Sequence, residues 1–392
     1  MALKKYLSYC QNGDSFETGK KMIEDILKKS GGELPDLLIL FCTAEHKYDK
    51  LIEGINSFTA GTVNLCGCTG TGIITSLGCD ESIYSAALMG LSSKDIKFTP
   101  FLFSDLSGKS EAIGNGISGL IKKLDPKNQT KKLIIMFPDG HNYKTSQVLD
   151  AIEAGLGYHV DCAGGNASND MTQDATFQFL NSEIKKDSIS GVILSGNFNY
   201  IIKLSHGSKA IGRAMTITRS KDNIIYEIDG EPALDAVARI TGRNVLIDFS
   251  HWSSFNALSE AFGDKNYPEN IIIKAILNVN EKEKSLILTT PMAQQARVRM
   301  AFRDKETILD RTKKMAEAAI SEMKTPDEAV YFYFDCAARG SYLFGEPDPD
   351  VESFMRGLGT QEMIGFFTFG EIAPVAGKNH FHNHTGVVLG VE

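Results

Sequence analysis

The stretch LLILFCTAEHKYDKLIEGINSFTAGTVNLCGCTGTG, residues 37–72, decides the fold of this chain. It opens with an apolar run that is typical of a buried strand, and the amphipathic stretch that ends at Phe58 predicts a helix. It closes on the Gly-rich corner 67–72, and two strand-like runs follow this corner. Residues 37–104 therefore predict a unit made of a strand, a helix, a second strand, a corner and a hairpin.

The same order of elements returns about 95 residues further along the chain. An apolar run at 133–137 precedes a helical pattern and the corner 164–168, so the second unit spans residues 132–205. The part of the chain from residue 330 onward repeats the pattern once more. We therefore expect three related units, and residues 271–290 fit a degenerate fourth unit.

Helical patterns alternate with strand-like runs along the chain, which places it in the α/β class. We expect a layered sandwich of mixed sheets, built from the repeated units and covered by helices. A chain of 392 residues is too long for one ordinary core, so we expect two regions. Residues 213–231 alternate like two short strands, and the motif DGEPA (229–233) predicts the start of a helix. We place the N-terminal region at 1–228 and the C-terminal region at 229–392.

The composition argues against several classes of partner. The net charge is −8 and the lysines and arginines are dispersed, so we expect no binding of nucleic acid or anionic lipid. The sequence shows no apolar run long enough for a membrane span and no cleavable leader, so we expect a cytoplasmic protein. The seven cysteines, an odd number, agree with that compartment. No Walker or dinucleotide-binding motif is found, so we expect no cofactor.

Polar side chains gather where the C-terminal strands are expected to end. Cys336 and Arg339 follow one apolar run, Glu371 follows a second, and Asn383 and Thr385 precede a third. Open α/β sheets usually bind ligands at the carboxyl ends of their strands. An arginine suits a carboxylate and a glutamate suits an ammonium group, while Gly-rich corners can supply backbone N–H donors. The full set of predicted binding residues is Gly67, Cys68, Thr69, Gly164, Gly165, Asn166, Cys336, Arg339, Gly370, Glu371, His382, Asn383 and Thr385.

The same residues allow interpretations without a ligand. Arg339 and Glu371 could pair with each other and pin two strands together. Glycines at strand corners are often needed for positive φ or for close approach of two backbones. His380, His382 and His384 could present three imidazoles to a metal, or could belong to a loop that enters the last strand.

A catalytic interpretation rests on Cys336. A thiol beside Arg339, with His382 on a neighbouring segment, has the parts of an activated nucleophile for a small amide or ester. Against this, Cys336 adjoins an apolar strand end, and no oxyanion-hole element can be named. A third interpretation is an interaction module that presents a surface to a signalling partner and binds no ligand. We favour a ligand-binding protein that is not an enzyme.

Taken in order, the motifs resemble those of the FIST family, a sensory module whose name stands for F-box and intracellular signal transduction. In the N-terminal half the resemblance rests on the corners GCT (67–69) and GGNA (164–167) and on the junction from His206 to Leu234. In the C-terminal half it rests on CAAR (336–339), GFFTFGEI (365–372) and HNHT (382–385).

The resemblance implies a FIST N-terminal region followed by a FIST C-terminal region. It also implies a role in intracellular signal transduction, in which the protein senses a small ligand such as an amino acid. With no output domain in the sequence, we expect a stand-alone member of the bacterial type. The sequence departs from the family pattern at Ala337, Ala338, Phe367 and His384, and these departures concern the identity of the ligand rather than the fold.

Overall fold

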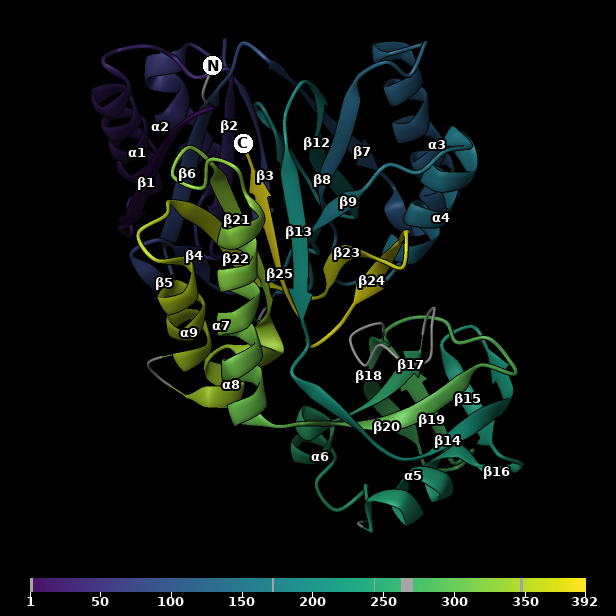
Figure 1. The fold of residues 1–392 in the computed structure, drawn as a ribbon. Coiled ribbons are helices and arrows are strands. Elements are labelled where there is room, and N and C mark those ends of the chain that lie inside the picture. The colour runs from purple at the N-terminus through teal and green to yellow at the C-terminus, as the bar shows by residue number, and fades with distance from the viewer. Residues whose placement is uncertain (1–2, 171–172, 243, 262–270, 346–347) are drawn as a thin grey trace.

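The computed structural model describes residues 3–170, 173–242, 244–261, 271–345 and 348–392. Figure 1 shows two parts, which are a large body built from three sheets with helices on their outer sides, and a smaller lobe below it. Strands and helices alternate through the body, and its sheets are mixed. The predicted layered α/β fold is therefore confirmed. Among the described helices, none is long and apolar enough to cross a membrane.

The body consists of three units with the same order of strands and helices. The first contains β1 (Lys4–Gln11), α1 (Ser15–Ser30), β2 (Leu37–Cys42), α2 (Tyr48–Thr59), β3 (Asn64–Thr69), β4 (Ile73–Thr75), β5 (Gly78–Asp80) and β6 (Ser85–Ser92). The second contains β7 (Ile96–Ser104), α3 (Leu106–Leu124), β8 (Lys131–Pro138), α4 (Thr145–Leu156), β9 (Cys162–Gly165), β10 (Gln178–Leu180), β11 (Glu183–Lys185) and β12 (Ser188–Gly196). The third contains β13 (Tyr200–Ser205), α7 (Lys305–Glu322), β21 (Val330–Cys336), α8 (Ser341–Phe344), α9 (Pro349–Leu358), β22 (Met363–Thr368), β23 (Glu371–Val375), β24 (Lys378–His382) and β25 (Gly386–Val391). The three predicted repeats are thus present, although β7 and β13 each begin a unit rather than end the one before.

Each sheet is completed by a hairpin from another unit. Strands β1, β6, β2 and β3 of the first unit are extended by β10 and β11 of the second. Strands β7, β12, β8 and β9 take the hairpin β23–β24 from the third unit, whose own sheet takes β4–β5 from the first. The exchange is cyclic, so the three units are related by an approximate threefold axis and no unit completes a sheet alone.

The central strand of each sheet is buried on both faces, which explains why its sequence is a continuous apolar run. Along β2, Leu37, Ile39 and Phe41 point into a core shared by the three sheets, while Leu38 and Leu40 pack against helices α1 and α2. Strands β8 and β21 alternate in the same way. The apolar runs seen in the sequence are therefore the three walls of one inner core.

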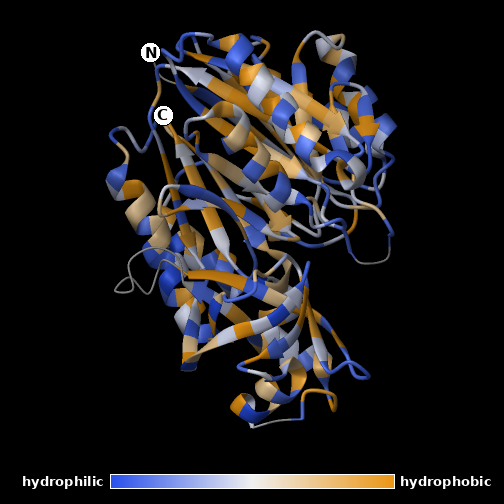
Figure 2. Cartoon of the chain, turned by 90° about the vertical axis from the view of Figure 1, so that its right-hand side faces the viewer, coloured by the Kyte–Doolittle hydropathy of each residue, from blue (hydrophilic) through white to orange (hydrophobic). Residues whose placement is uncertain are grey.

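Pairs of helices cover the outer faces of the sheets, namely α1 with α2, α3 with α4, and α7 with α9 (Figure 1). Figure 2 shows that these helices carry hydrophilic and hydrophobic residues side by side, as expected for helices with one buried face. Asp14 and Asp304 cap the first helix of the first and third units by accepting a backbone N–H.

The smaller lobe is a closed barrel inserted between β13 and α7. It contains β14 (Ser208–Lys221), β15 (Ile224–Ile228), β16 (Glu231–Pro232), α5 (Ala233–Thr241), α6 (Phe249–Phe255), β17 (Asn256–Ala261), β18 (Ile271–Asn280), β19 (Ser285–Leu288) and β20 (Arg297–Arg303). Its strands follow the order β14, β20, β17, β18, β19, β15, and β15 pairs again with β14. The barrel has its own core, which includes Met215, Ile217, Leu258 and Met300.

The degenerate fourth unit expected at 271–290 is wrong, because this segment supplies β18 and β19 of the barrel. The strands expected within 213–231 and the helix start after Pro232 are present as β14, β15 and α5. The boundary predicted between residues 228 and 229 falls inside the barrel, which takes strands from both sides of it.

Replacing Gly365 tests the close packing of paired strands in the body. A Cβ at Gly365 would overlap the backbone carbonyl oxygen of Tyr333 on the neighbouring strand. We expect Gly365→Ala to lower the free energy of unfolding by at least about 2 kcal/mol in urea denaturation. Gly119→Ala on α3 is the control, because nothing lies within 4 Å of its Cβ position, and a gain of about 0.5 kcal/mol is expected. Equal effects of the two substitutions would contradict the packing described here.

Candidate functional site

The third unit departs from the other two at the carboxyl end of its central strand. Phe41, Phe137 and Phe334 occupy equivalent positions, because each follows the residue that pairs with a glycine of the adjoining parallel strand. The next two residues are Cys42 and Thr43 in the first unit, Pro138 and Asp139 in the second, and Asp335 and Cys336 in the third. The third unit is also the one that carries the barrel. These features therefore distinguish the third unit from the other two.

Arg339 is fully buried, and its guanidinium group is held by residues of the third unit. Its Nε lies 2.8 Å from Asp350 and 3.1 Å from Asp335, and another nitrogen donates to Thr312 at 2.6 Å. A fourth contact joins it to the backbone oxygen of Ser205. Burial alone would lower the pKa of Arg339, but the carboxylates of Asp335 and Asp350 raise it well above its ordinary value. The proposed pairing of Arg339 with Glu371 is wrong, and Arg339 instead ties β13, β21, α7 and α9 together.

Glu371 faces Cys336 rather than Arg339. One carboxyl oxygen accepts from the Thr368 hydroxyl at 2.6 Å, and the other accepts from the Thr385 backbone N–H at 3.1 Å. The Cys336 backbone N–H donates to the Thr385 carbonyl at 3.1 Å, which places Cys336 beside the same segment. Burial raises the pKa of Glu371 to about 8, and burial likewise raises the pKa of the Cys336 thiol. The structure thus brings three predicted residues, Cys336, Glu371 and Thr385, into contact.

Arg303, which the sequence analysis did not single out, reaches this cluster from the barrel. It is the last residue of β20, and its side chain is 1% exposed. One terminal nitrogen donates to the Ser254 carbonyl in the barrel at 2.8 Å, and another donates to the Ala338 carbonyl in the body at 2.9 Å. Its Nε has no hydrogen-bond partner among the described atoms. Burial lowers the pKa of Arg303 to about 10.

A second polar group without a partner lies near Arg303. His384 has a φ of 55° and is buried, and its Nδ1 has no hydrogen-bond partner among the described atoms. Burial lowers the pKa of His384, and the charges of Arg303 and Arg339 lower it further. Buried polar groups are nearly always hydrogen-bonded, so two unpaired nitrogens in one neighbourhood are unusual.

Asn383 connects the body to the barrel. Its side-chain oxygen accepts from the Ala275 backbone N–H at 3.3 Å and from the Thr289 hydroxyl, both in the barrel. Together with Arg303 it defines the contact between the two parts, which we call the seam. The predicted site residue Asn383 therefore lies at the seam and faces the barrel.

The three histidines before the last strand do not converge on a metal. His382 is bonded through Nε2 to the Ala373 carbonyl at 3.1 Å, and burial lowers its pKa to about 3. The rings of His380 and His382 are 6.2 Å apart. Within the described ranges, no group of three histidine, cysteine, aspartate or glutamate side chains could hold a metal ion.

The Gly-rich corners meet one another near the threefold axis. The Asn166 N–H donates to the Gly370 carbonyl at 2.7 Å, and the Ser168 N–H donates to the Thr69 carbonyl at 3.1 Å. A Cβ at Gly67 or at Gly164 would overlap the backbone of the adjoining strand. The backbone groups of these corners are thus used largely by contacts between units, with Cys68 buried behind them and Gly165 packed against Thr368. Their predicted role in ligand binding stays a prediction.

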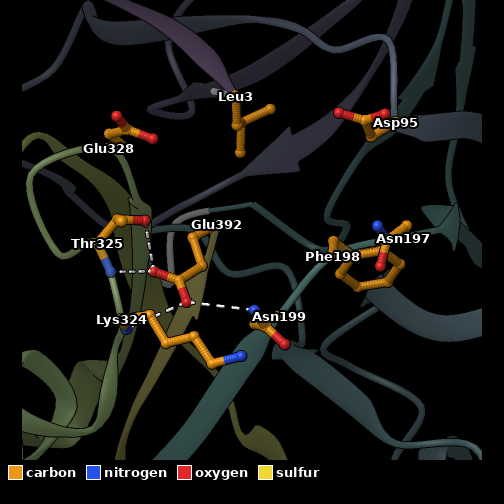
Figure 3. Close-up of a pocket in the computed structure, with 9 residues that line it drawn as sticks. All are labelled: Leu3, Asp95, Asn197, Phe198, Asn199, Lys324, Thr325, Glu328 and Glu392. Atoms are coloured by element: carbon orange, nitrogen blue, oxygen red, sulfur yellow. Dashed lines mark hydrogen bonds between the residues drawn. The ribbon is translucent and has the colours of Figure 1, made fainter. Parts of the chain in front are cut away.

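One hollow of the body lies away from these residues. It has a volume of about 470 Å³ and is lined by residues that include Leu3, Asp95 and Glu392. Figure 3 shows that the Glu392 carboxylate is held by Thr325, Lys324 and Asn199. This hollow contains none of the predicted site residues.

Comparison with known proteins agrees with the motifs. The family model of the FIST N domain matches residues 36–231, and the family model of the FIST C domain matches residues 233–374. Uncharacterized protein Rv0628c of Mycobacterium tuberculosis is 23% identical over 257 residues, which is 64% of this chain and 66% of that protein. Uncharacterized protein MJ1623 of Methanocaldococcus jannaschii is 23% identical over 230 residues, which is 56% of this chain and 42% of that protein. The matched part thus spans slightly less than two thirds of the mycobacterial relative.

Glu371→Gln tests the protonation state of the buried carboxyl group. The pKa of Glu371 is raised in the folded chain from 4.5 to about 8, so its favourable contribution is complete below pH 4.5 and is lost as the pH rises through 8. We expect the stability of the unsubstituted protein to fall relative to Glu371→Gln between pH 5 and pH 9 in urea unfolding. Asp348, whose pKa is raised by burial to about 7, titrates in both proteins and cancels in the difference. A difference that is constant with pH would show that Glu371 is ionised throughout.

Proposed function

The chain belongs to the FIST family, and we propose that it is a sensory protein that binds an amino acid or a similar small carboxylate without transforming it. The two FIST domains cover nearly the whole chain, so the family predicted from the motifs is confirmed. FIST domains are associated with sensing in signal transduction. The kind of ligand, the lack of catalysis, a cytoplasmic location and a signalling partner belong to the proposal.

The observation that carries this proposal is the bridge that Arg303 makes across the seam. Its two terminal nitrogens hold Ser254 in the barrel and Ala338 in the body, while its Nε is buried without a partner. A planar guanidinium group can hold two carbonyl groups at once, so the position of Arg303 depends on both parts of the protein. A small carboxylate that binds at the seam can therefore change how Arg303 holds the barrel and the body together.

The architecture supports a sensory role for the seam. The barrel and the body have separate cores, and the chain crosses between them at only two places, after β13 and before α7. The polar contacts of Arg303 and Asn383 span the gap between these cores. Contacts between separately folded parts can change with modest cost, so binding at the seam can alter how the barrel sits on the body.

The state of Cys336 supports binding rather than catalysis. Reactive cysteines are partly exposed and have a lowered pKa, because the thiolate is the nucleophile. Cys336 is buried, and burial raises the pKa of its thiol. The predicted base His382 is bonded to the Ala373 carbonyl instead of the thiol. A thiol-dependent hydrolase is the second candidate function, since a thiol and a carboxyl group lie in one neighbourhood and influence each other's pKa.

A thermal-shift screen of the protein against the common amino acids and small carboxylates tests the proposal. We expect a specific compound to raise the melting temperature, because ligand at a hundred times its Kd adds about 2.7 kcal/mol of stability. Arg303→Lys should abolish this shift, since lysine cannot hold the Ser254 and Ala338 carbonyls together across the seam. Arg219→Lys is the matched control, because Arg219 pairs with Glu227 on an exposed barrel hairpin. If no compound shifts the melting temperature, the interaction module without a ligand becomes the better interpretation.

Cys336→Ala separates binding from catalysis. We expect the variant to keep its affinity for the shifting compound within about threefold, because the thiol is a buried neighbour rather than a nucleophile. The unsubstituted protein should also react slowly with iodoacetamide at neutral pH, as followed by mass spectrometry of Cys336. Rapid stoichiometric alkylation of Cys336, with turnover of a small amide or ester that the variant lacks, would favour the hydrolase.

A further inference from the structure

An open groove lies at the outer side of the seam. Its volume is about 420 Å³, which is within the range of about 300–1,000 Å³ that small-molecule sites occupy. One wall is formed by α6 of the barrel with its capping residue Asp248, and the other by Lys305 at the start of α7 together with Tyr342 and Leu343 of α8. The groove therefore takes side chains from both parts of the protein.

Hydroxyl groups cross the seam along this groove. Ser254 donates to the Tyr342 hydroxyl at 2.9 Å, and the Ser250 hydroxyl lies 3.3 Å from the same oxygen. Tyr342 is 62% exposed although it is a large aromatic residue. These three hydroxyls provide both donors and acceptors, so they can hold a polar head group while the barrel and the body stay in contact.

The groove carries one charge of each sign. Lys305 is exposed and forms no salt bridge within the described part of the chain, and its ammonium group lies 5.7 Å from the Phe344 ring. Asp248 is exposed on the barrel wall, where one of its oxygens accepts from the His251 backbone N–H at 3.1 Å. Its other oxygen is available to a ligand. A cation and a carboxylate on facing elements match a zwitterion, whose carboxylate and ammonium groups need opposite partners.

The remaining lining of the groove consists of His251 and two apolar residues. Phe255 and Leu343 contribute an aromatic ring and an aliphatic side chain, one from each wall. Phe255 also lines a second hollow with a volume of about 390 Å³, in which Trp252 and Phe302 are further lining residues. An apolar surface beside a charged pair favours a ligand that has both a zwitterionic head and an apolar side chain.

Ser254 and Arg303 connect the groove to the buried cluster. Ser254, whose hydroxyl faces Tyr342, accepts the hydrogen bond from Arg303 through its carbonyl oxygen. Arg303 in turn holds Ala338, two residues beyond Cys336. Occupation of the groove can therefore displace Arg303 without any contact between the ligand and the buried carboxyl groups.

We propose that this groove is the binding site for an α-amino acid with an apolar side chain, whose carboxylate is held by Lys305 and whose ammonium group is held by Asp248. The proposal rests on the proposed sensory function and gives it a site and a ligand class. Phe255 and Leu343 receive the side chain, and the hydroxyls of Ser250, Ser254 and Tyr342 complete the contacts of the head group.

Isothermal titration calorimetry with L-leucine and L-phenylalanine tests this site in the full chain. Lys305→Met and Asp248→Asn are each expected to weaken binding by about tenfold or more, the cost of losing one charge-assisted contact. The controls are Lys313→Met and Asp310→Asn, which are exposed on α7 and paired with Glu317 and Lys314. They should change the affinity by no more than about twofold.

Ligand analogues provide a second readout that does not depend on folding of a variant. Leucinamide lacks the carboxylate and N-acetyl-leucine lacks the ammonium group, so both should bind at least about tenfold more weakly than L-leucine. Lys305→Met should bind leucine and leucinamide equally. Equal affinities of all variants, equal binding of the analogues, or no binding of either amino acid at millimolar concentration would each overturn this site. If a different carboxylate binds, and its binding is lost in Arg303→Lys but not in Lys305→Met, the groove is not the site although the sensory function stands. If no carboxylate binds at all, the sensory function is overturned as well.

Discussion

The exchange of hairpins around the threefold axis is the constraint on which the rest of the structure depends. Each of the three sheets in the body ends in two strands from another unit, so each sheet is complete only when all three units are in place. The inner faces then enclose one core, in which the rings of Phe41 and Phe137 are 5.1 Å apart and those of Phe137 and Phe334 are 6.2 Å apart. Glycines on the parallel strands allow the close approach that this geometry requires. The body should therefore form as one cooperative unit rather than as three separate repeats.

Within this nearly symmetric body, the third unit is the exception, and the candidate site lies there. Asp335 replaces an uncharged residue found at the same position in the other units, and it enters the buried network of Arg339 and Asp350. The attraction within a buried ion pair is largely offset by the free energy needed to remove its charges from water, so such a network adds little to the stability of the fold. Its effect is geometric, because it fixes the ends of several elements beside Cys336 and the point where the chain enters the barrel. The inserted barrel then places Arg303 and Asn383 against that fixed framework.

The body and the barrel have separate cores, and the chain joins them after β13 and before α7. Burial raises the pKa of both the Cys336 thiol and the Glu371 carboxyl group, which favours their neutral forms near pH 7. A neutral thiol is a poor nucleophile, so the cluster is poorly suited to catalysis. The outer groove has complementary properties, with exposed charges, hydroxyls and apolar side chains. Arg303 bonds to Ser254 in the wall of the groove and to Ala338 near the cluster, so it connects the two.

The sequence by itself determined the units and the family. Continuous apolar runs such as 37–41 and 330–334 predicted strands buried on both faces, and the order of corners and motifs indicated the FIST family, because strand burial and turn chemistry are local properties. It also indicated that Cys336, Glu371 and Thr385 share one neighbourhood, since all three lie near the ends of predicted strands. The sequence did not predict that hairpins pass from one unit to the next, that β14 to β20 close into a barrel, that Arg339 pairs with aspartates, or that Arg303 bonds to Ala338. These features depend on pairings between residues far apart in the chain, such as Gly365 with Ile74, and such pairings leave no local periodicity to read.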